Sequence, residues 1–169
     1  VATPQAAQAR LGVLPDGFGL YPRLTAREHL DYFGALQGIE SDRLAQRTEE
    51  LLDLLDMRAI ADRRTAGFSH GERTKVALAR ALVHDPQTML LDEPTAGMGH
   101  EDVARIAALI RSVARNRTIL MVEHNLGVVA ELSDVITVLQ RGRILAEGAY
   151  DQVSRHPDVV QAYMGTVHV

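Results

Sequence analysis

Two adjacent carboxylates, Asp92 and Glu93, directly follow a short apolar run at residues 88–91. Neighbouring residues of a strand point to opposite faces, so the two side chains are expected to have different roles. One carboxylate suits Mg²⁺, which prefers hard oxygen ligands and keeps much of its water. The other suits the orientation or deprotonation of an attacking water molecule. Taken alone, the pair is explained equally well by a strand that ends in a polar turn before Pro94.

A histidine stands in a comparable place, because His124 follows a second apolar run at residues 118–122 and the intervening Glu123. An imidazole at the end of a buried strand is suited to contact a terminal phosphate and the attacking water. Taken singly, such a histidine is more often a structural or surface residue. It gains meaning only if the fold brings its strand beside the strand of Asp92 and Glu93.

The third candidate is the start of a helix, where Ser69 is followed by His70, Gly71 and Glu72. Amide groups and the dipole at a helix N-terminus favour an anion, and a glycine lets a phosphate approach the backbone closely. Ser-x-x-Glu is also an ordinary capping box, and Thr25 with Glu28 repeats it without obvious chemistry. In isolation, the capping interpretation is the better one.

The elements that must position these residues alternate along the chain. Strands are expected at 11–14, 88–91 and 118–122, a hairpin at 135–146, and helices at 25–36, 44–55, 69–83, 103–113, 125–131, 151–155 and 158–163. Alternation of helices with short apolar strands predicts an α/β fold with a parallel sheet covered by helices. The stretch 24–56 is helical only, which predicts an α-helical subdomain beside the sheet. Ligands of such sheets bind beyond the carboxyl ends of the strands.

Composition narrows the class of protein. The 169 residues are 46% hydrophobic and 24% charged, with a net charge of −4 and no cysteine. These values are typical of a globular domain, give no electrostatic footprint for nucleic acid, and exclude disulfides and thiolate metal sites. No apolar run is long enough to cross a bilayer. Lys75 is the only lysine.

In order and spacing, these segments resemble the ATP-binding-cassette (ABC) ATPase family over nearly the whole chain. Residues 68–72 are similar to its signature motif, 75–82 to the helix behind that motif, 88–94 to Walker B with the catalytic glutamate, 95–100 to the D-loop, 122–124 to the switch-histidine segment and 134–148 to the closing hairpin. A chance match to all of these motifs in order is far less probable than a match to any one of them.

The resemblance implies a P-loop NTPase-like sheet and the cofactors ATP and Mg²⁺. It implies that Asp92 serves Mg²⁺, that Glu93 polarises the attacking water, and that His124 supports the terminal phosphate. In the family, two such domains close head to tail around two ATP molecules. Ser69 and Gly71, with Glu72 in the same motif, would contact the ATP held by a second ATPase subunit.

Further partners follow from the same resemblance. The helices between residues 25 and 56 would receive a membrane permease subunit, which places the chain at the cytoplasmic face of a bacterial cell membrane. No nucleic-acid partner is expected. Asp16 stands where the family has the glutamine of its Q-loop, and a carboxylate there could still bind Mg²⁺ through water, although it cannot donate a hydrogen bond when ionised.

The sequence also departs from the family. A Walker A loop needs Gly-x-x-x-x-Gly-Lys-Ser/Thr, but Lys75 follows Thr74 inside a predicted helix. We therefore expect the N-terminal part of the fold to be absent, which would leave sheet edges and an apolar face uncovered. Residues 1–169 are accordingly interpreted as a partial ABC ATPase domain, with a helical and signature region at 24–85, a core with the closing hairpin at 86–148, and C-terminal helices at 149–169.

Several motif positions carry unusual residues. His70 replaces a signature glycine, Glu72 the usual glutamine, and Gly99 the D-loop aspartate. Residues 12–94 resemble the ATPases of sodium or drug exporters, whereas residues 96–165 resemble those of branched-chain amino-acid or amide importers. The family resemblance therefore implies no transport direction and no substrate.

Three functions remain open from the sequence. The first is an ABC transporter ATPase subunit. The second is a truncated, non-catalytic chain that offers only its signature motif in trans to a complete partner. The third is a soluble ABC protein of DNA repair or translation. Such proteins usually carry long coiled-coil insertions or a second cassette, and residues 1–169 show neither.

Overall fold

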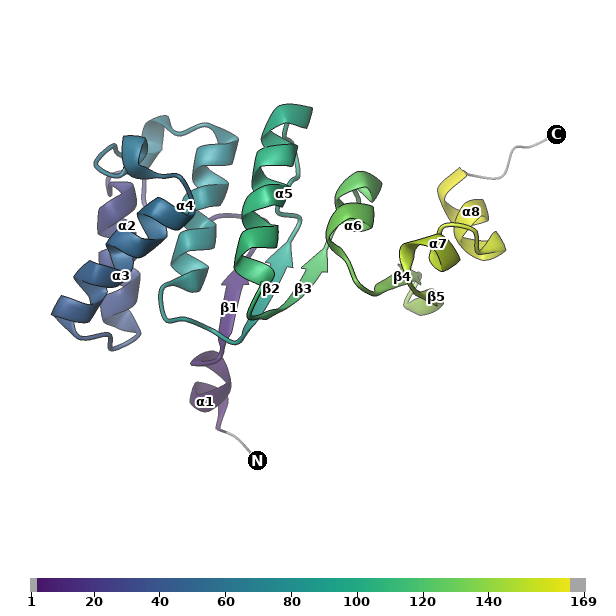
Figure 1. Ribbon diagram of the computed structural model, residues 1–169, viewed down its shortest axis with the longest axis horizontal. Coiled ribbons are helices and arrows are strands. Elements are labelled where there is room, and N and C mark those ends of the chain that lie inside the picture. The colour runs from purple at the N-terminus through teal and green to yellow at the C-terminus, as the bar shows by residue number, and fades with distance from the viewer. Residues whose placement is uncertain (1–2, 165–169) are drawn as a thin grey trace. The chain divides into compact units, whose positions relative to one another are not determined.

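The computed structural model describes residues 3–164, which form two compact units, one ending at Glu123 and the other beginning at His124 (Figure 1). The first unit contains α1 (Pro4–Gln8), β1 (Leu11–Leu14), α2 (Ala26–Leu36), α3 (Ser41–Leu54), two 3₁₀ turns (Arg58–Ile60 and Thr65–Gly67), α4 (His70–Leu82), β2 (Thr88–Asp92), α5 (His100–Ala114) and β3 (Thr118–Val122). The second contains α6 (Leu126–Leu132), β4 (Ile136–Gln140), β5 (Arg143–Gly148), α7 (Tyr150–Val153) and α8 (Pro157–Met164).

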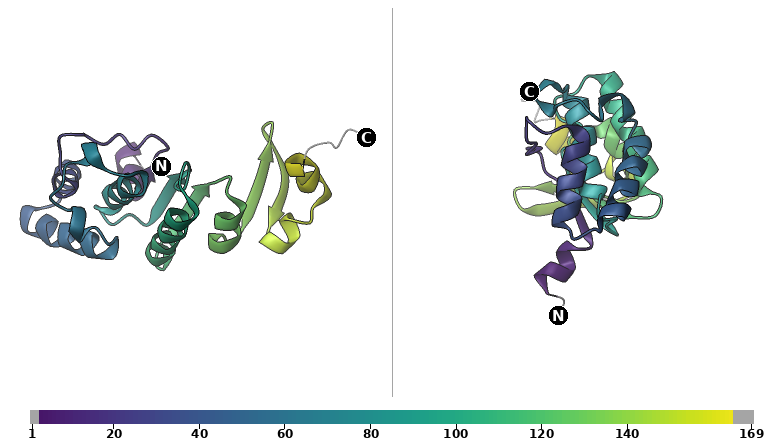
Figure 2. Two further views of the ribbon diagram at one scale, coloured as in Figure 1. Left: turned by 90° about the horizontal axis from the view of Figure 1, so that it is seen from above. Right: turned by 90° about the vertical axis from the view of Figure 1, so that its left-hand side faces the viewer.

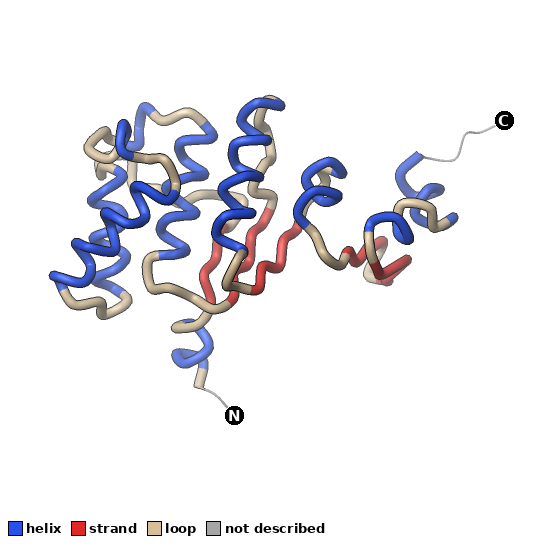
Figure 3. Tube along the Cα trace, in the orientation of Figure 1, coloured by secondary structure: helices blue, strands red, loops and turns tan. Residues whose placement is uncertain are grey.

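The first unit is built on a parallel sheet in the order β1-β2-β3, whose strands run side by side in Figure 3. Leu14 pairs with Leu91, and Leu91 pairs in turn with Met121. All three strands were expected from their apolar runs, and both pairings are parallel, so the predicted α/β fold with a parallel sheet is confirmed. The carboxyl ends of the three strands consequently lie at one edge of the sheet.

The two faces of this sheet differ. Leu14, Met89 and Leu91 are at most 1% exposed, on the face where α4 packs against β1. Alternate residues of the same strands point to the other face, and there Val13 is 41% and Leu120 62% exposed. Within the described residues of this unit, the predicted uncovered apolar face is therefore confirmed.

Helices α2 and α3 form the predicted all-helical region and pack against each other and against α4. Their inward positions recur at helical spacing, and Leu30, Leu51 and Leu52 are fully buried. The capping box that predicted the start of α2 is present, with the Glu28 amide donating to Thr25 Oγ1 at 3.1 Å. Such a cap satisfies amide groups that have no partner within the helix.

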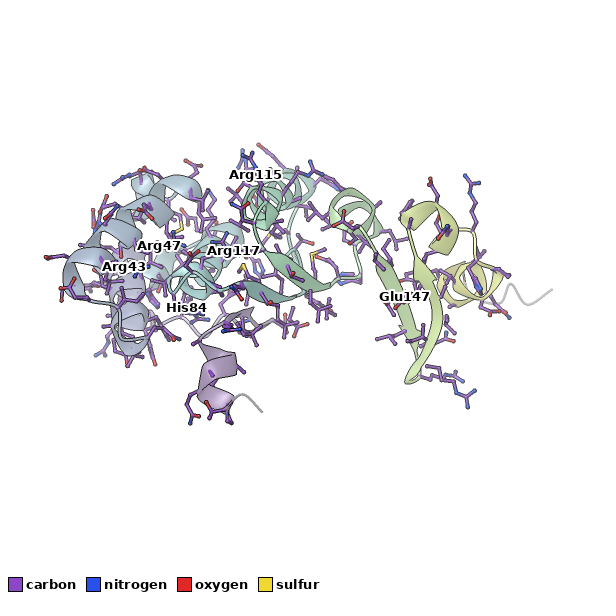
Figure 4. The ribbon with its side chains drawn as sticks, turned by 60° about the horizontal axis from the view of Figure 1, so that its bottom comes forward. Arg43, Arg47, His84, Arg115, Arg117 and Glu147 are labelled. Carbon is purple, nitrogen blue, oxygen red and sulfur yellow. The ribbon has the colours of Figure 1, made fainter. Side chains whose placement is uncertain are left out.

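Arginines anchor the loop that leads from α4 into β2. Arg117 donates to the backbone oxygen of Pro86 and pairs with Asp85, and Arg47 of α3 lies 3.6 Å from the same Asp85 carboxylate. The three labelled groups Arg47, Arg117 and His84 mark this end of the sheet in Figure 4. Since Asp85 has a φ of 55°, these contacts hold a left-handed residue at the entry to β2.

The second unit is a hairpin with helices beside it, as the views of Figure 2 show. Strands β4 and β5 are antiparallel and are joined at Arg141 and Gly142, both with positive φ. Two consecutive left-handed residues make the tight turn that suits the twist of a hairpin. The predicted hairpin is thus confirmed. Residues 165–169, the end of the predicted region 149–169, lie outside the described residues.

Helix α1 was not predicted. It is short and has no buried residue, so no apolar periodicity announces it. The usable signal was Thr3 as the N-cap, followed by Pro4 in the first helical turn. The interval 57–68, between α3 and α4, contains the two 3₁₀ turns. None of the described helices is both long and apolar enough to span a bilayer.

Buried His29 makes a pH dependence predictable. The Tyr21 amide donates to His29 Nε2 at 2.8 Å, so Nδ1 carries the proton and donates to the Thr25 carbonyl oxygen at 2.9 Å. Burial lowers the pKa of His29, with Arg80 acting in the same direction, while the Thr25 hydrogen bond and Glu28 oppose the shift. The folded state thus favours the neutral ring.

We expect the free energy of unfolding to fall as the pH drops below about 6.5, the ordinary pKa of histidine, because the unfolded chain then binds the proton more readily. The slope for one such group is at most about 1.4 kcal/mol per pH unit. Urea unfolding at pH 7.5, 6.5 and 5.5 measures it, and His29→Gln should flatten the curve. An unchanged slope in that variant would contradict the assignment.

Candidate functional site

Acidic residues gather at the carboxyl edge of the parallel sheet. Asp92 ends β2 and pairs in register with Val122, the last residue of β3. Glu93 follows Asp92, Glu123 follows Val122, and Asp16 comes two residues after the end of β1. The expectation that Asp92 and Glu93 lie at this edge is therefore met by the strand register.

His124 comes directly after Glu123 and is the first residue of the second unit. Its convergence with Asp92 and Glu93 on one phosphate stays a prediction.

Glu93 has an unusual backbone. Its φ is 47°, in the left-handed region that few non-glycine residues adopt. Its amide donates to the Val122 carbonyl oxygen at 2.9 Å, and its own carbonyl oxygen accepts from the Ala96 amide at 3.1 Å. The chain therefore leaves β2 in a tight, hydrogen-bonded turn that presents Glu93 at the sheet edge, and such local strain is frequent at functional sites.

Asp92 offers one carboxylate to a metal. Among residues 3–164, no group of three or more histidine, aspartate or glutamate side chains is arranged to hold an ion. That arrangement fits Mg²⁺, which is commonly bound through one or two carboxylates and keeps several waters. It does not fit a metal that needs a complete cage of protein ligands.

The N-terminus of α4 has a complete capping box. The Glu72 amide donates to Ser69 Oγ at 3.2 Å, and the Ser69 amide donates to Glu72 Oε2 at 2.8 Å. Arg63 donates to Glu72 Oε1 at 2.8 Å. Burial acts to raise the pKa of Glu72, but the bonds from Ser69 and Arg63 outweigh it and hold that pKa below its usual value. Glu72 is therefore an ionised cap whose two oxygens already have partners.

A shallow hollow of about 220 Å³ lies at this helix tip. It is lined by Ser69, Gly71, Glu72, Lys75, Asp102, Arg105 and Ile106. Gly71 is buried, and a methyl group added there would lie 3.7 Å from Asp102 Cγ. The lining comes from the start of α4, with its N-cap Ser69, and from α5.

Two basic residues of α4 have structural partners. Lys75 Nζ donates to the carbonyl oxygen of Asp56 at 2.9 Å. Arg80 donates to the carbonyl oxygens of Phe18 and Gly19 at 2.7 and 3.1 Å, and its guanidinium lies 4.8 Å from the centre of the Phe33 ring. Arg80 thereby ties α4 to the segment after Asp16, a role that the sequence did not reveal.

Comparison with known proteins decides the family. A model of the family described as "ABC transporter" matches residues 2–96, which is more than half of the chain. The chain belongs to the ABC transporter family. A second model, "Branched-chain amino acid ATP-binding cassette transporter", matches residues 143–169 and agrees with the resemblance noted for the C-terminal part.

Individual ABC relatives support the assignment. The ABC transporter ATP-binding protein NatA of Bacillus subtilis is 39% identical over 155 residues, covering 90% of this chain and 63% of NatA. The Nod factor export ATP-binding protein I of Paraburkholderia xenovorans is 36% identical, covering 86% of this chain and 48% of that protein. Methionine import ATP-binding protein MetN 2 of the same species is 30% identical, covering 94% and 42%. The chain thus spans between about two fifths and two thirds of these relatives.

Proteins named for import and for export both match, and all three are named as ATP-binding proteins. In this chain Asp92 offers a carboxylate of the kind that suits Mg²⁺, and the N-terminus of α4 offers amide groups of the kind that suit an anion. Residues 1–169 contain no Walker A pattern, the loop that holds the phosphates of ATP in this family. Their only lysine, Lys75, donates to Asp56 instead.

Proposed function

We propose that this chain is the ATP-binding and ATP-hydrolysing subunit of an ABC transporter and powers transport across a membrane. The observation that carries the proposal is the placement of Asp92 and Glu93 at the carboxyl edge of a parallel sheet, within a chain of this family. ATP with Mg²⁺ would supply the phosphoanhydride bond whose hydrolysis drives the transporter. The chain's own residues would hold, orient and polarise the reacting groups.

Each site residue has a proposed role. Asp92 holds Mg²⁺ through water, and Glu93 orients the attacking water and takes up its proton. His124 donates to the terminal phosphate. Asp16 adds a second, water-mediated contact to the metal. These roles are consistent with hard oxygen donors around Mg²⁺ and with a base close to the water that it deprotonates.

The helix tip of α4 would act on a second ATPase subunit. Ser69 presents its hydroxyl, and Gly71 leaves room for close approach of a phosphate to the helix N-terminus. Following the family resemblance, we assign them to the nucleotide of the partner subunit. Glu72 supports this motif as its cap, through the hydrogen bonds to Ser69.

The helices α2 and α3 would receive a membrane permease subunit, at the cytoplasmic face of a bacterial membrane. Around α2, Tyr21 and Tyr32 are 48% and 46% exposed, and Leu36 is 65% exposed. The Tyr21 and Phe33 rings stack, and the Tyr32 ring meets both of them edge to face. Exposed aromatic clusters of this kind are enriched where proteins bind partners.

A second function is favoured by one observation, the lack of a Walker A pattern in residues 1–169. A non-catalytic chain would offer Ser69 and Gly71 to a complete partner and would not cleave ATP itself. Phosphate release by the full-length protein separates the two functions. Turnover that disappears in Glu93→Gln supports the ATPase, and its absence in the wild type supports the non-catalytic chain.

We expect a purified polypeptide of residues 1–169 to release no phosphate from ATP and Mg²⁺ above the level of a protein-free control. The reason is that the backbone amides and lysine of a Walker A loop, which hold the phosphates in place, are not among these residues. Colorimetric phosphate release measures this. Turnover by this polypeptide that Glu93→Gln abolishes would contradict the prediction.

A further inference from the structure

The turn that carries Glu93 is held from the neighbouring strand by a residue outside the site assigned above. Thr95 is 4% exposed, and both its backbone amide and its hydroxyl donate to Glu123 Oε1, the amide at 3.2 Å. The two residues are 28 positions apart in the sequence. We infer that Glu123 is a positioning residue for Glu93, an inference that rests on the proposed role of Glu93 as the base.

Hydrogen bonds from the end of β3 restrain the chain on both sides of the Glu93 side chain; together they are called the clamp below. Before it, the Glu93 amide donates to the carbonyl oxygen of Val122. After it comes Pro94, whose ring fixes φ, and then Thr95 on the Glu123 carboxylate. Val122, the last residue of β3, acts through its carbonyl oxygen and the next residue, Glu123, through its carboxylate, so two consecutive residues hold both ends of the segment 93–95.

The clamp explains how Glu93 keeps its left-handed backbone. A non-glycine residue in that region costs on the order of 1 kcal/mol or more, and it persists only where the surroundings fix it. A carboxylate that accepts two hydrogen bonds from Thr95 provides such a restraint, because a charged acceptor binds more strongly than a neutral one. Release of Thr95 would let Glu93 relax toward an ordinary φ and move its carboxylate.

A displaced base loses efficiency while nucleotide affinity is preserved. A misplacement of about 1 Å can lower a rate about a hundred-fold. Glu123 itself contacts Thr95 and is assigned no contact with the reacting groups. Its substitution should therefore lower kcat and leave the KM for ATP nearly unchanged.

The test uses the full-length protein in its transporter complex, with two matched pairs of variants. Glu123→Ala removes both acceptor contacts, whereas Glu123→Gln keeps an acceptor oxygen in the same place. Thr95→Val removes the hydroxyl at constant volume, whereas Thr95→Ser keeps it. We expect kcat to fall about 10- to 100-fold in the Ala and Val variants, with KM within about two-fold, and to stay within about three-fold of wild type in Gln and Ser. The double variant Thr95→Val with Glu123→Ala should lose little more than Glu123→Ala alone.

A second readout needs no turnover. In nucleotide-free protein, hydrogen exchange of the Thr95 and Ala96 amides should accelerate in Glu123→Ala and stay near wild type in Glu123→Gln. Val113→Ala changes a buried residue of α5 and serves as the stability control. It should lower Tm, but it should neither accelerate the exchange of these two amides nor lower kcat selectively.

The outcomes separate the two claims. If wild type shows no Glu93-dependent turnover, the proposed function fails, and hydrogen exchange still decides whether Glu123 holds Thr95. If turnover exists and Glu123→Ala keeps kcat within two-fold, or Thr95 exchange is unchanged, the positioning role is overturned. If Val113→Ala and Glu123→Ala have similar Tm values and lose kcat equally, the positioning role is also overturned. If Glu123→Ala does not fold, the Thr95→Val and Thr95→Ser pair decides alone.

Discussion

Replacing Glu93 by glutamine should lower the ATP turnover of the full-length protein about a hundred- to ten-thousand-fold, the usual contribution of a general base. The amide has nearly the same size as the carboxylate, so the tight turn at φ 47° should persist. What is lost is the ability to take a proton from the attacking water. Because nucleotide binding uses other groups, the KM for ATP should change little. Steady-state phosphate release measures both constants.

The control for this prediction is Glu101→Gln. Glu101 is an exposed residue in the first turn of α5 that pairs with Arg105 on the surface. Exposed pairs of this kind contribute little, so turnover should stay within two-fold of wild type. Retention of more than a third of the wild-type kcat in Glu93→Gln would contradict the role given to Glu93.

Gly12→Ala should produce a large loss of stability in the first unit. Gly12 is buried in β1, and an added methyl group would clash with the backbone oxygen of Ala81 in α4 and lie 2.9 Å from Pro86 Cγ. Backbone atoms cannot give way as a flexible side chain can. Overpacking of this kind destabilises by about 1–3 kcal/mol, and we expect the upper part of that range.

Urea unfolding of the protein measures the change in the free energy of unfolding, with Gly17→Ala as the matched control. Nothing lies within 4 Å of a methyl group added at Gly17, in the turn after β1. That variant should stay within about 0.5 kcal/mol of wild type. Equal stabilities of the Gly12 and Gly17 variants would show that α4 does not pack on β1 as described.

Much of the frame was predictable because its signals are local. Apolar runs gave β1, β2 and β3, and the pattern Ser/Thr-x-x-Glu gave the starts of α2 and α4 at Thr25 and Ser69. Each of these signals depends on the apolar or polar character of residues close together in the chain, which a sequence displays directly. The placement of Asp92 and Glu93 followed, since the carboxyl ends of parallel strands share an edge.

The contacts that refine the site were not predictable in the same way. Thr95 and Glu123 meet only because β2 and β3 pair in one register, and a sequence does not display that register. The left-handed φ of Glu93 likewise depends on hydrogen bonds across strands rather than on its own preference. Arg80 reaches Phe18 across 62 residues, which no local pattern announces.

Complementation between two copies tests the central claim most directly, namely that Glu93 of one subunit and the Ser69 helix tip of another act at one nucleotide. Full-length copies with different tags are co-expressed, one carrying Glu93→Gln and the other Ser69→Arg, and the mixed complex is purified through both tags. Single-turnover ATP cleavage is then measured. A site shared between subunits leaves one intact pair in the mixed complex, so we predict cleavage there, and none when both changes lie in one copy paired with wild type. The reverse pattern would contradict the account.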